Sequence, residues 1–501
     1  MSYLRVPNEI TLDEIRAKGS SLSAGMYRRV IIPTSQVKRV GDLIKEFENG
    51  VSVGSLSYVK SSQYRFIRTK ALQDFGYLTQ FKGDAVIYIT PRAYLGATSR
   101  YPLRAIADGD ILYARGGSVG EVAIADGCGN ATISGHVMKI VFRSDYWYSF
   151  AFMKHPICKL QQQPNIKGAI AALDNFTKDT LLDCLIPFPN QSDANRVVQY
   201  VSVLAQALVE KEKAIREKNK AIDSAIEQEL TQHQCNGAFI HSFPNIQEVR
   251  AVGRLDTGMY SEDFKRKQFI ITNYQHGYAT YEELGFEIGR GQNLQLSNIG
   301  KSIYSQVPKS NFYRLMAPTD ISEYRTVRQF RYLGNKKNLD VLKQGDVVFG
   351  AEGFGKGRVV ILADEVQGTI SNIHGITFHH KHGEIIEGIF LGCFLGYLRN
   401  IGIVDAIGAG GSGGSLAIGY FHHVQFPKFP DHKKDAIARL YHNPTPPPAD
   451  NPTLDTFVEW HRRWNQNLGI WELDREMKNL QQVLADVQED IIEGKTVHVP
   501  I

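Results

Sequence analysis

The sequence lacks the features that mark disulfide-stabilised, zinc-binding or membrane-spanning proteins. Its 501 residues include five cysteines, namely Cys128, Cys158, Cys184, Cys235 and Cys393, and no two of them have CxxC spacing. An odd number without paired spacing argues against a disulfide framework or a zinc ribbon and predicts free thiols. The N-terminal residues show no signal peptide, and no apolar run is long enough to span a bilayer. We therefore expect a cytoplasmic protein with no membrane contact.

Recognisable catalytic motifs are also missing. The sequence contains no GxSxG, no HExxH and no Asn/Asp-Pro-Pro-aromatic string of an amino-methyltransferase. Two histidine groups, His379, His380 and His382 and then His422 and His423, lack further ligands at metal-binding spacing. We therefore expect a chain that has no metal site, binds no cofactor and catalyses no reaction.

One glycine-rich string resembles a phosphate-binding loop but is incomplete. Residues 350–356 match GxxxxGK, yet Gly357 stands where Ser or Thr would hold magnesium. The following residues, 358–362, are strand-like, so the helix N-terminus that should face the phosphates is missing. A nucleotide-dependent enzyme is a weaker alternative. A second glycine-rich tract, residues 408–414, fits either a phosphate-approaching backbone or a flexible loop.

The overall composition is that of a globular protein with several cores. Hydrophobic residues make up 43% and charged residues 22% of the chain. The length favours two to four domains. The formal net charge of +5 comes from 57 basic and 52 acidic residues. This surplus is compatible with nucleic-acid binding but too small to indicate it.

The chain repeats itself once, and this duplication is its most informative feature. Four short strings recur in the same order at a nearly constant offset, and a histidine, His136 or His374, follows the third string in each copy. The rest of the two halves differs widely, which indicates an old duplication. The matching strings are Gly25-Met26-Tyr27 with Gly258-Met259-Tyr260, Gly109-Asp110 with Gly345-Asp346, Thr132-Ile133-Ser134 with Thr369-Ile370-Ser371, and Phe188-Pro189 with Phe429-Pro430.

Each half ends in a region with the heptad spacing of a packed helix. The first helix is predicted over residues 193–232, which gives about 60 Å at 1.5 Å per residue. Lys211 and Lys218 interrupt its apolar positions. Two such helices in equivalent places predict antiparallel packing against each other, while packing of each helix on its own domain is the alternative. The apolar positions are Val201, Leu204, Leu208, Ile215, Ile222 and Ala225 in the first helix, and Leu473, Met477, Leu480, Leu484, Val487 and Ile491 in the second.

These patterns divide the chain into four parts. Residues 1–190 and 236–430 are predicted to form two similar β-rich domains, because short strands flank glycine-rich turns in both. Residues 191–235 form the first helical spacer. Residues 431–501 contain a stiff proline-rich linker around residues 443–448 and then the second helical spacer.

Basic and aromatic residues in the diverged parts are the candidate binding residues. Arginine pairs bidentately with guanine, and both arginine and lysine bind phosphate. Any one of these residues could equally be a solvated surface charge, so the prediction concerns the set. Arg115 in the glycine turn and the run Arg325, Arg328 and Arg331 are the preferred contacts. The set is Lys60, Arg65, Arg68, Arg92, Tyr94, Arg115, Arg290, Arg325, Arg328, Arg331, Lys336 and Lys356.

The motif of Gly-Asp, two apolar residues and a glycine turn that enters a second strand resembles the specificity subunits of type I restriction-modification enzymes. It occurs at residues 109–124 and again at 345–360, where Ala351 stands in place of Arg115. The exits of the domains, Leu185–Pro189 and Val424–Pro430, also resemble that family. The segment between Pro430 and Leu473 is longer than a family spacer needs.

The resemblance implies an α+β protein with two similar β-rich target-recognition domains, joined by long helices packed as an antiparallel coiled coil. Each domain would read one half of a bipartite site in double-stranded DNA, and the helices would set the separation. Methylation and cleavage would belong to partners, namely two methyltransferase (M) subunits that bind S-adenosylmethionine and restriction/translocase (R) subunits that bind ATP. The alternative is a duplicated β-domain protein with a structural or protein-interaction role and no DNA.

Overall fold

The computed structural model describes residues 3–17, 20, 22, 27, 29–73, 75–81, 85–162, 181–255, 257–364, 366–408 and 415–501. Gly25 and Met26 of the first repeated string and most of the glycine tract at 408–414 lie outside these residues. The chain divides into two compact units. Unit 1 comprises residues 1–212, 448–464 and 476–501, and unit 2 comprises residues 213–447 and 465–475.

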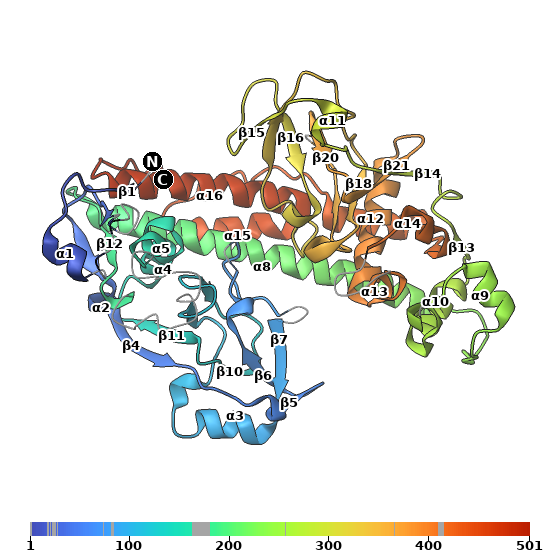
Figure 1. The fold of residues 1–501 in the computed structure, drawn as a ribbon, viewed down its shortest axis with the longest axis horizontal. Helices are drawn as coiled ribbons and strands as arrows, with labels where there is room; N and C mark the ends of the chain where they lie inside the picture. Colours follow the sequence, from blue (N-terminus) through green and yellow to red (C-terminus); the bar gives the residue numbers. More distant parts are fainter. Residues whose placement is uncertain are drawn as a thin grey trace. The chain divides into compact units, whose positions relative to one another are not determined.

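Unit 1 contains two four-stranded sheets and two shorter strand pairs (Figure 1). The first sheet has the order β4-β11-β8-β9 and the second has the order β10-β6-β7-β5, while β12 pairs with β3 and β1 with β2. The strands are β1 (Leu4–Arg5), β2 (Arg29–Val30), β3 (Val37–Arg39), β4 (Ile44–Asn49), β5 (Tyr58–Val59), β6 (Tyr64–Ile67), β7 (Val86–Ile89), β8 (Ile111–Ala114), β9 (Val122–Ile124), β10 (Asn130–Ile133), β11 (Val137–Phe142) and β12 (Leu185–Pro187).

Unit 2 builds the same sheets from its own strands. Its first sheet has the order β14-β21-β18-β19, its second has the order β15-β17-β16-β20, and β13 pairs with β22. The strands are β13 (Tyr278–Ala279), β14 (Phe286–Arg290), β15 (Ile303–Ser305), β16 (Tyr313–Met316), β17 (Arg331–Gly334), β18 (Val347–Gly350), β19 (Val359–Ile361), β20 (Thr369–Ser371), β21 (Gly375–His380) and β22 (Phe426–Pro427).

The order and direction of the strands confirm the duplication predicted from the sequence. In each unit one strand pair of the second sheet is parallel, β10 with β6 and β20 with β16, and the remaining pairs of both sheets are antiparallel. Two domains with a shared mixed topology and so little common sequence are diverged copies of one scaffold.

The repeated Gly-Asp string forms the turn that leads into β8 and β18. Gly109 and Gly345 have φ angles of +94° and +87°, in the region that favours glycine. The carboxylate of Asp110 accepts the backbone N–H of Ala107 at 2.8 Å, and Asp346 accepts that of Lys343 at 2.8 Å. The string therefore recurs because both copies need the same turn.

The repeated Phe-Pro string is offset by one residue at the level of the backbone. Phe188 donates its N–H to Gln36, and the equivalent donor in unit 2 is Lys428, which bonds to Gly277. Unit 2 therefore has one extra residue before Phe429. Both phenylalanine rings nevertheless pack on the helix that follows the first sheet, α4 or α12.

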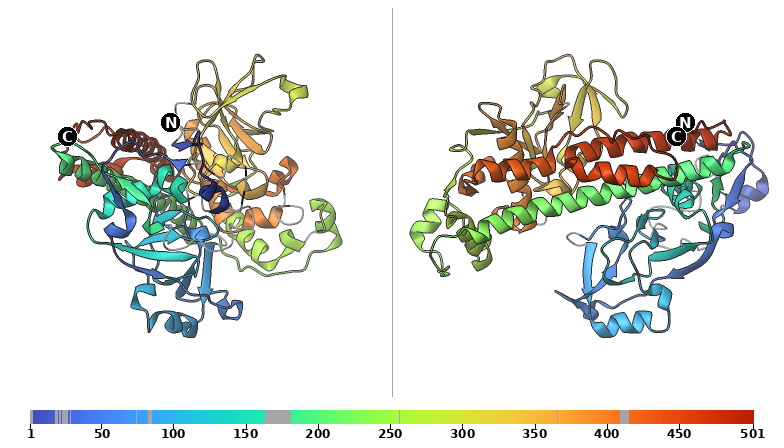
Figure 2. Two further views of the ribbon diagram at one scale, coloured as in Figure 1. Left: turned by 60° about the vertical axis from the view of Figure 1, so that its left-hand side comes forward. Right: turned by 180° about the vertical axis from the view of Figure 1, so that it is seen from behind.

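Unit 1 has a core that joins its first sheet to both long helices, α8 (Ala194–Gln232) and α16 (Ile470–Ile492). Val201, Leu208, Leu484 and Ile491 are buried together in this core, and Leu480 packs half-buried against it. The start of α8 thus packs on the end of α16, and α15 lies beside them (Figure 2). The other helices of unit 1 are α1 (Leu12–Ala17), α2 (Val40–Leu43), α3 (Pro91–Thr98), α4 (Tyr146–Lys154), α5 (Pro156–Gln162) and most of α15 (Phe457–Asn467).

Unit 2 holds the other ends of the same two helices, the end of α8 and the start of α16. Ile215, Ile222 and Leu473 are buried there. Together with the packing in unit 1, this order confirms the predicted antiparallel arrangement and the predicted fold class. The other helices of unit 2 are α9 (Ile246–Val252), α10 (Glu262–Thr272), α11 (Leu296–Ile299), α12 (Ile385–Asn400), α13 (Ile403–Ile407) and α14 (Asp431–Tyr441).

The two lysines that interrupt the heptad pattern have specific neighbours. Lys211 is fully buried, its Nζ lies 5.1 Å from the ring centroid of Trp464, and burial lowers its pKa to about 8. Lys218 donates to the backbone oxygen of Gln466 at 3.1 Å. Both lysines therefore contact residues of α15, a helix in the segment that looked too long for a spacer.

Other expectations can be checked in the described residues. Residues 442–456 form no helix or strand, as the proline-rich sequence predicts. All five cysteines are free thiols; Cys235 is exposed and the other four are buried. No helix in the described parts of the chain is long and apolar enough to cross a membrane.

Candidate nucleic-acid interface

A glycine-rich turn joins β8 to β9 in unit 1 and β18 to β19 in unit 2. The backbone N–H of Arg115 bonds to the carbonyl of His136 at 2.8 Å, and that of Ala351 bonds to His374 at 3.0 Å. These matching bonds make Arg115 and Ala351 equivalent, as the sequence spacing indicates. The residue of unit 2 that is equivalent to Arg115 is therefore not an arginine.

In unit 1 three polar residues meet at this turn. Nη1 of Arg115 donates to Oδ1 of Asn49, at the end of β4, at 2.9 Å. His136 is exposed and lies against Gly116, where an added Cβ would come within 2.5 Å of its Nδ1. We call Asn49, Arg115 and His136 the turn cluster of unit 1.

The equivalent place in unit 2 holds different side chains. Glu352, at the position of Gly116, forms an ion pair with His374, and the two side chains are 44% and 56% exposed. Arg290 occupies the register position of Asn49, since the two residues pair with Ile376 and Met138 respectively. Its guanidinium donates to the backbone oxygen of Leu416 at 2.8 Å. We call Arg290, Glu352 and His374 the turn cluster of unit 2.

A second predicted group comes together beside β6 in unit 1. The rings of Tyr64 and Tyr94 stack with centroids 4.6 Å apart, which holds the start of α3 next to the start of β6. Arg92 precedes Tyr94 in α3, Lys60 lies in the short connection before β6, and both are exposed. Exposed cations within four residues of stacked aromatic rings are suited to binding nucleic acid.

The other predicted residues are spread over the two units. Arg65 and Arg68 are half-buried, and Arg65 lies over the ring of Phe81 at 5.4 Å. Lys336 is exposed after β17. Nζ of Lys356 pairs with Asp405 at 3.0 Å.

The structure corrects the prediction that Arg325 contacts DNA. Its side chain is 4% exposed, and its guanidinium bonds to Asn219 and Asp223 of α8, the latter at 2.6 Å. The buried guanidinium is thus used to hold α8 and does not face solvent. The sequence shows an arginine in a polar run and gives no sign of partners about a hundred positions away.

The neighbouring arginines do not form one exposed surface with Arg325. Arg331 pairs with Asp320 at 2.8 Å. Arg328 is half-buried, and burial together with nearby Arg358 lowers its pKa to about 10. Of the three arginines predicted as preferred contacts, Arg325 is buried, while Arg328 and Arg331 stay predictions.

The glycine string at 350–356 lacks the surroundings of a nucleotide site. Strand β19 follows Lys356, at the place where a phosphate-binding loop would lead into a helix. An added Cβ at Gly350 would lie 1.8 Å from the backbone oxygen of Gly355, because the turn closes tightly on itself. The glycines therefore serve the compact turn.

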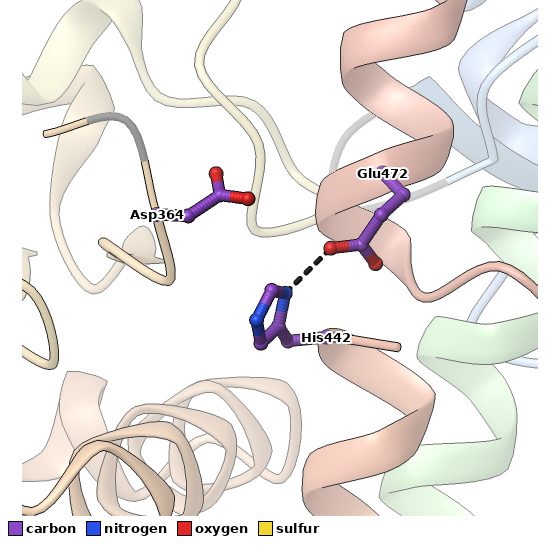
Figure 3. A group of neighbouring side chains, drawn as sticks. All are labelled: Asp364, His442 and Glu472. Atoms are coloured by element: carbon purple, nitrogen blue, oxygen red, sulfur yellow. Dashed lines mark hydrogen bonds and ion pairs between the residues drawn. The ribbon is translucent and has the colours of Figure 1, made fainter. Parts of the chain in front are cut away.

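One group of His, Asp and Glu side chains in the described residues has metal-ligand composition (Figure 3). Ligand atoms of Asp364, His442 and Glu472 lie within 4.8 Å of one another. Nδ1 of His442 bonds to Oε1 of Glu472 at 2.5 Å, while Oε2 accepts backbone N–H groups, including that of Asn443 at 2.9 Å. The carboxylate of Asp364 accepts the indole N–H of Trp471. Hydrogen bonds within unit 2 therefore account for the arrangement.

The pKa values of this group follow from the same contacts. The hydrogen bond to Glu472 raises the pKa of His442 above its usual value. Burial opposes ionisation of Glu472, but the bonds from His442 and from the backbone of Asn443 lower its pKa overall. The pair is thus favoured as imidazolium and carboxylate, and it ties the end of α14 to the start of α16.

The fold and the turn clusters define a duplicated β-rich protein with antiparallel long helices and a diverged polar surface on each copy. No protein-family model matches the sequence, and no curated protein matches it significantly. Among solved structures, the chain is similar to the S subunit of a type I restriction-modification system from M. genitalium, with 11% identity, a TM-score of 0.40 and coverage of 93% of this chain and 96% of that one.

Two further solved structures are similar over most of their length. The HsdS subunit from Thermoanaerobacter tengcongensis has 13% identity, a TM-score of 0.27 and coverage of 92% of this chain and 97% of that one. A chain from a structure that describes complex assembly and conformational transition of the type I R-M system has 12% identity, a TM-score of 0.25 and coverage of 92% and 98%. Each of the three matches covers more than 90% of this chain.

Proposed function

We propose that this chain is the specificity subunit of a type I restriction-modification complex, and that each unit reads one half of a bipartite site in double-stranded DNA. The observation that carries the proposal is the pair of turn clusters. One scaffold is built twice, and the surface residues at one equivalent place differ between the copies. Such a pattern suits two readers of two different short sequences.

The chemistry of the exposed side chains supports DNA as the ligand. Arginine at each turn cluster matches the acceptors on guanine or phosphate. In unit 1, Lys60, Arg92 and the stacked Tyr64 and Tyr94 add a second cationic surface. The predicted contacts apart from Arg325 remain candidates, and Arg325 is replaced by Arg290 as the preferred arginine of unit 2.

The chain itself is proposed to be non-catalytic. Methylation and cleavage would belong to two methyltransferase subunits and to restriction/translocase subunits, which carry S-adenosylmethionine and ATP. The antiparallel helices α8 and α16 would fix the distance between half-sites, since half-sites one helical turn apart are about 34 Å from centre to centre. Helix α8, at about 60 Å, is long enough for this.

Selection from a random duplex library tests the proposal. The full chain, alone and with its co-expressed methyltransferase, should enrich two short sequence blocks separated by a gap of fixed length and free sequence. Binding should weaken steeply with salt, because phosphate contacts release counterions. Enrichment of no sequence in either sample would contradict the proposal and favour the protein-interaction alternative. Nucleotide binding that is lost in Lys356→Ala would favour the nucleotide-dependent alternative.

A further inference from the structure

The turn clusters of the two units differ in their charged side chains. In unit 1 the cluster holds Arg115 with Asn49 and His136 and contains no acid. In unit 2 the equivalent of Gly116 is Glu352, an exposed carboxylate that pairs with His374. An acid at a proposed DNA surface needs a reason, because phosphates repel it.

We propose that Glu352 reads a base in the half-site of unit 2 by accepting a hydrogen bond from an exocyclic amino group in the major groove, N4 of cytosine or N6 of adenine. This inference rests on the proposed function and adds the chemistry of one contact. Amino groups on base edges are the donors that DNA offers to a carboxylate. A phosphate offers only acceptors and cannot be the partner of Glu352.

The structure holds one carboxylate oxygen of Glu352 and leaves the other available. Nδ1 of His374 donates to Oε1, and Oε2 has no hydrogen-bond partner within the described residues. The carboxylate is therefore oriented while one oxygen still faces outward. His374 acts as a positioning residue, because it touches Glu352 and fixes the rotamer.

The surrounding turn allows close approach to a groove. Gly353 follows Glu352 directly, and an added Cβ there would meet nothing within 4 Å. Its φ angle of +62° is one that glycine adopts easily. The open space at Gly353, next to Glu352, would let the backbone of a duplex come close to the carboxylate.

The equivalent surface of unit 1 should read the opposite pattern. Arg115 presents donors, and Oδ1 of Asn49 holds its Nη1 at 2.9 Å, as His374 holds Glu352. A guanidinium oriented in this way matches the O6 and N7 acceptors of guanine. The two half-sites are therefore expected to differ in hydrogen-bond polarity at the positions under the two turns.

The test compares duplex selection by the full chain, with its methyltransferase, for the wild type and five variants. Arg115→Gln identifies the block read by unit 1. Glu352→Ala should then lower the preference at one position of the other block by about tenfold and leave the first block unchanged. Glu352→Gln should favour adenine there, since glutamine pairs with adenine. Glu262→Gln removes another exposed acid of unit 2, which pairs with Arg266, and should change nothing.

The outcomes separate the two levels of the proposal. The wild-type base at the affected position distinguishes cytosine from adenine as the amino-group donor. A wild type that selects no bipartite site would overturn the proposed function. A normal wild-type site with Glu352→Ala unchanged, or with both blocks weakened equally, would overturn only the role of Glu352. Unchanged thermal unfolding of Glu352→Ala confirms that the variant is folded, and His374→Ala should weaken the same position less than Glu352→Ala.

Discussion

Unit 1 and unit 2 hold helix α8 through the same loop, which donates the hydrogen bonds in both units but uses a different donor group in each. In unit 1 the loop after β6 offers the backbone N–H of Tyr77, and α8 supplies the carboxylate of Glu212 at 2.6 Å. In unit 2 the loop after β16 supplies the guanidinium of Arg325, and α8 supplies Asn219 and Asp223. The duplicated scaffold preserves where the loop meets the helix, while the residue that carries the charge has changed.

The turn clusters show the same kind of difference at the surface. The arginine comes from the glycine turn in unit 1 and from the end of β14 in unit 2. Backbone bonds and strand register are shared, and side chains are not. Substitutions and pH changes that act on one unit at a time test this contrast, and their expected effects decrease in the order given.

The largest expected loss follows removal of the buried guanidinium in unit 2. Arg325→Ala leaves Asp223 without its buried partner, which typically costs about 3–5 kcal/mol. Denaturant unfolding followed by hydrogen exchange should show the loss in unit 2, with unit 1 less affected. Arg266→Ala, which breaks an exposed ion pair on α10, should cost about 0.2–1 kcal/mol. Equal losses of stability from Arg325→Ala and Arg266→Ala would contradict this prediction.

Acidification should weaken unit 1 through two buried histidines. Burial lowers the pKa of His155 to about 4 and that of His461 to about 3. Because these folded-state values lie below that of the unfolded chain, the stability is complete above about pH 6.5 and is lost as the pH falls. At pH 5 the loss is about 2 kcal/mol for each histidine. Thermal unfolding of His155→Gln and His461→Gln should show a smaller decrease between pH 7 and pH 5.

In unit 1 the contact between α8 and the loop that corresponds to the contact of Arg325 is made by Glu212. Glu212→Ala leaves the buried N–H of Tyr77 without its carboxylate acceptor, which should cost roughly 1–2 kcal/mol. Glu212→Gln keeps an acceptor at this position and should cost less. Hydrogen exchange of the Tyr77 amide reports the change directly, and an amide that stays equally protected in Glu212→Ala would contradict it.

The smallest expected effect is the loss of stability of unit 2 as the pH rises. The pKa of His442 is raised by Glu472, so the stabilisation is complete below the unfolded value of about 6.5. It is lost as the pH rises through the raised value. NMR titration of His442 in the wild type and in Glu472→Gln checks this, and the pKa should fall in the variant. An unchanged pKa would show that the pair is not coupled.

The scaffold was largely predictable because its requirements are local. Gly-Asp turns and heptad spacing depend on residues close together in the sequence, so the roles of Gly109 and Gly345 or of Val201 and Leu208 follow from the spacing alone. Helix α8, Ala194–Gln232, matches the predicted limits closely. The one-residue difference before Phe429 does not follow from the sequence, because it changes the backbone register and keeps the aromatic contact.

The candidate site was less predictable because it depends on contacts distant in sequence. Arg325 resembles a surface arginine in the sequence, which does not show that Asp223 lies beside it. In the sequence Glu352 is only one residue of a glycine string, and no pattern marks Asn49. The repeated His136 and His374 were a usable signal, since a histidine kept at one place in two diverged copies marks a shared surface.

The length of the gap between the two recognised blocks tests the central claim most directly. Insertion of one heptad after Ile215 in α8, together with one in the facing part of α16, lengthens the helices by about 10 Å, or about three base pairs. Selected duplexes should keep both sequence blocks, with the gap longer by about three base pairs. A gap of unchanged length, or a change in the blocks themselves, would contradict the view that two base-reading units are spaced by a pair of antiparallel helices.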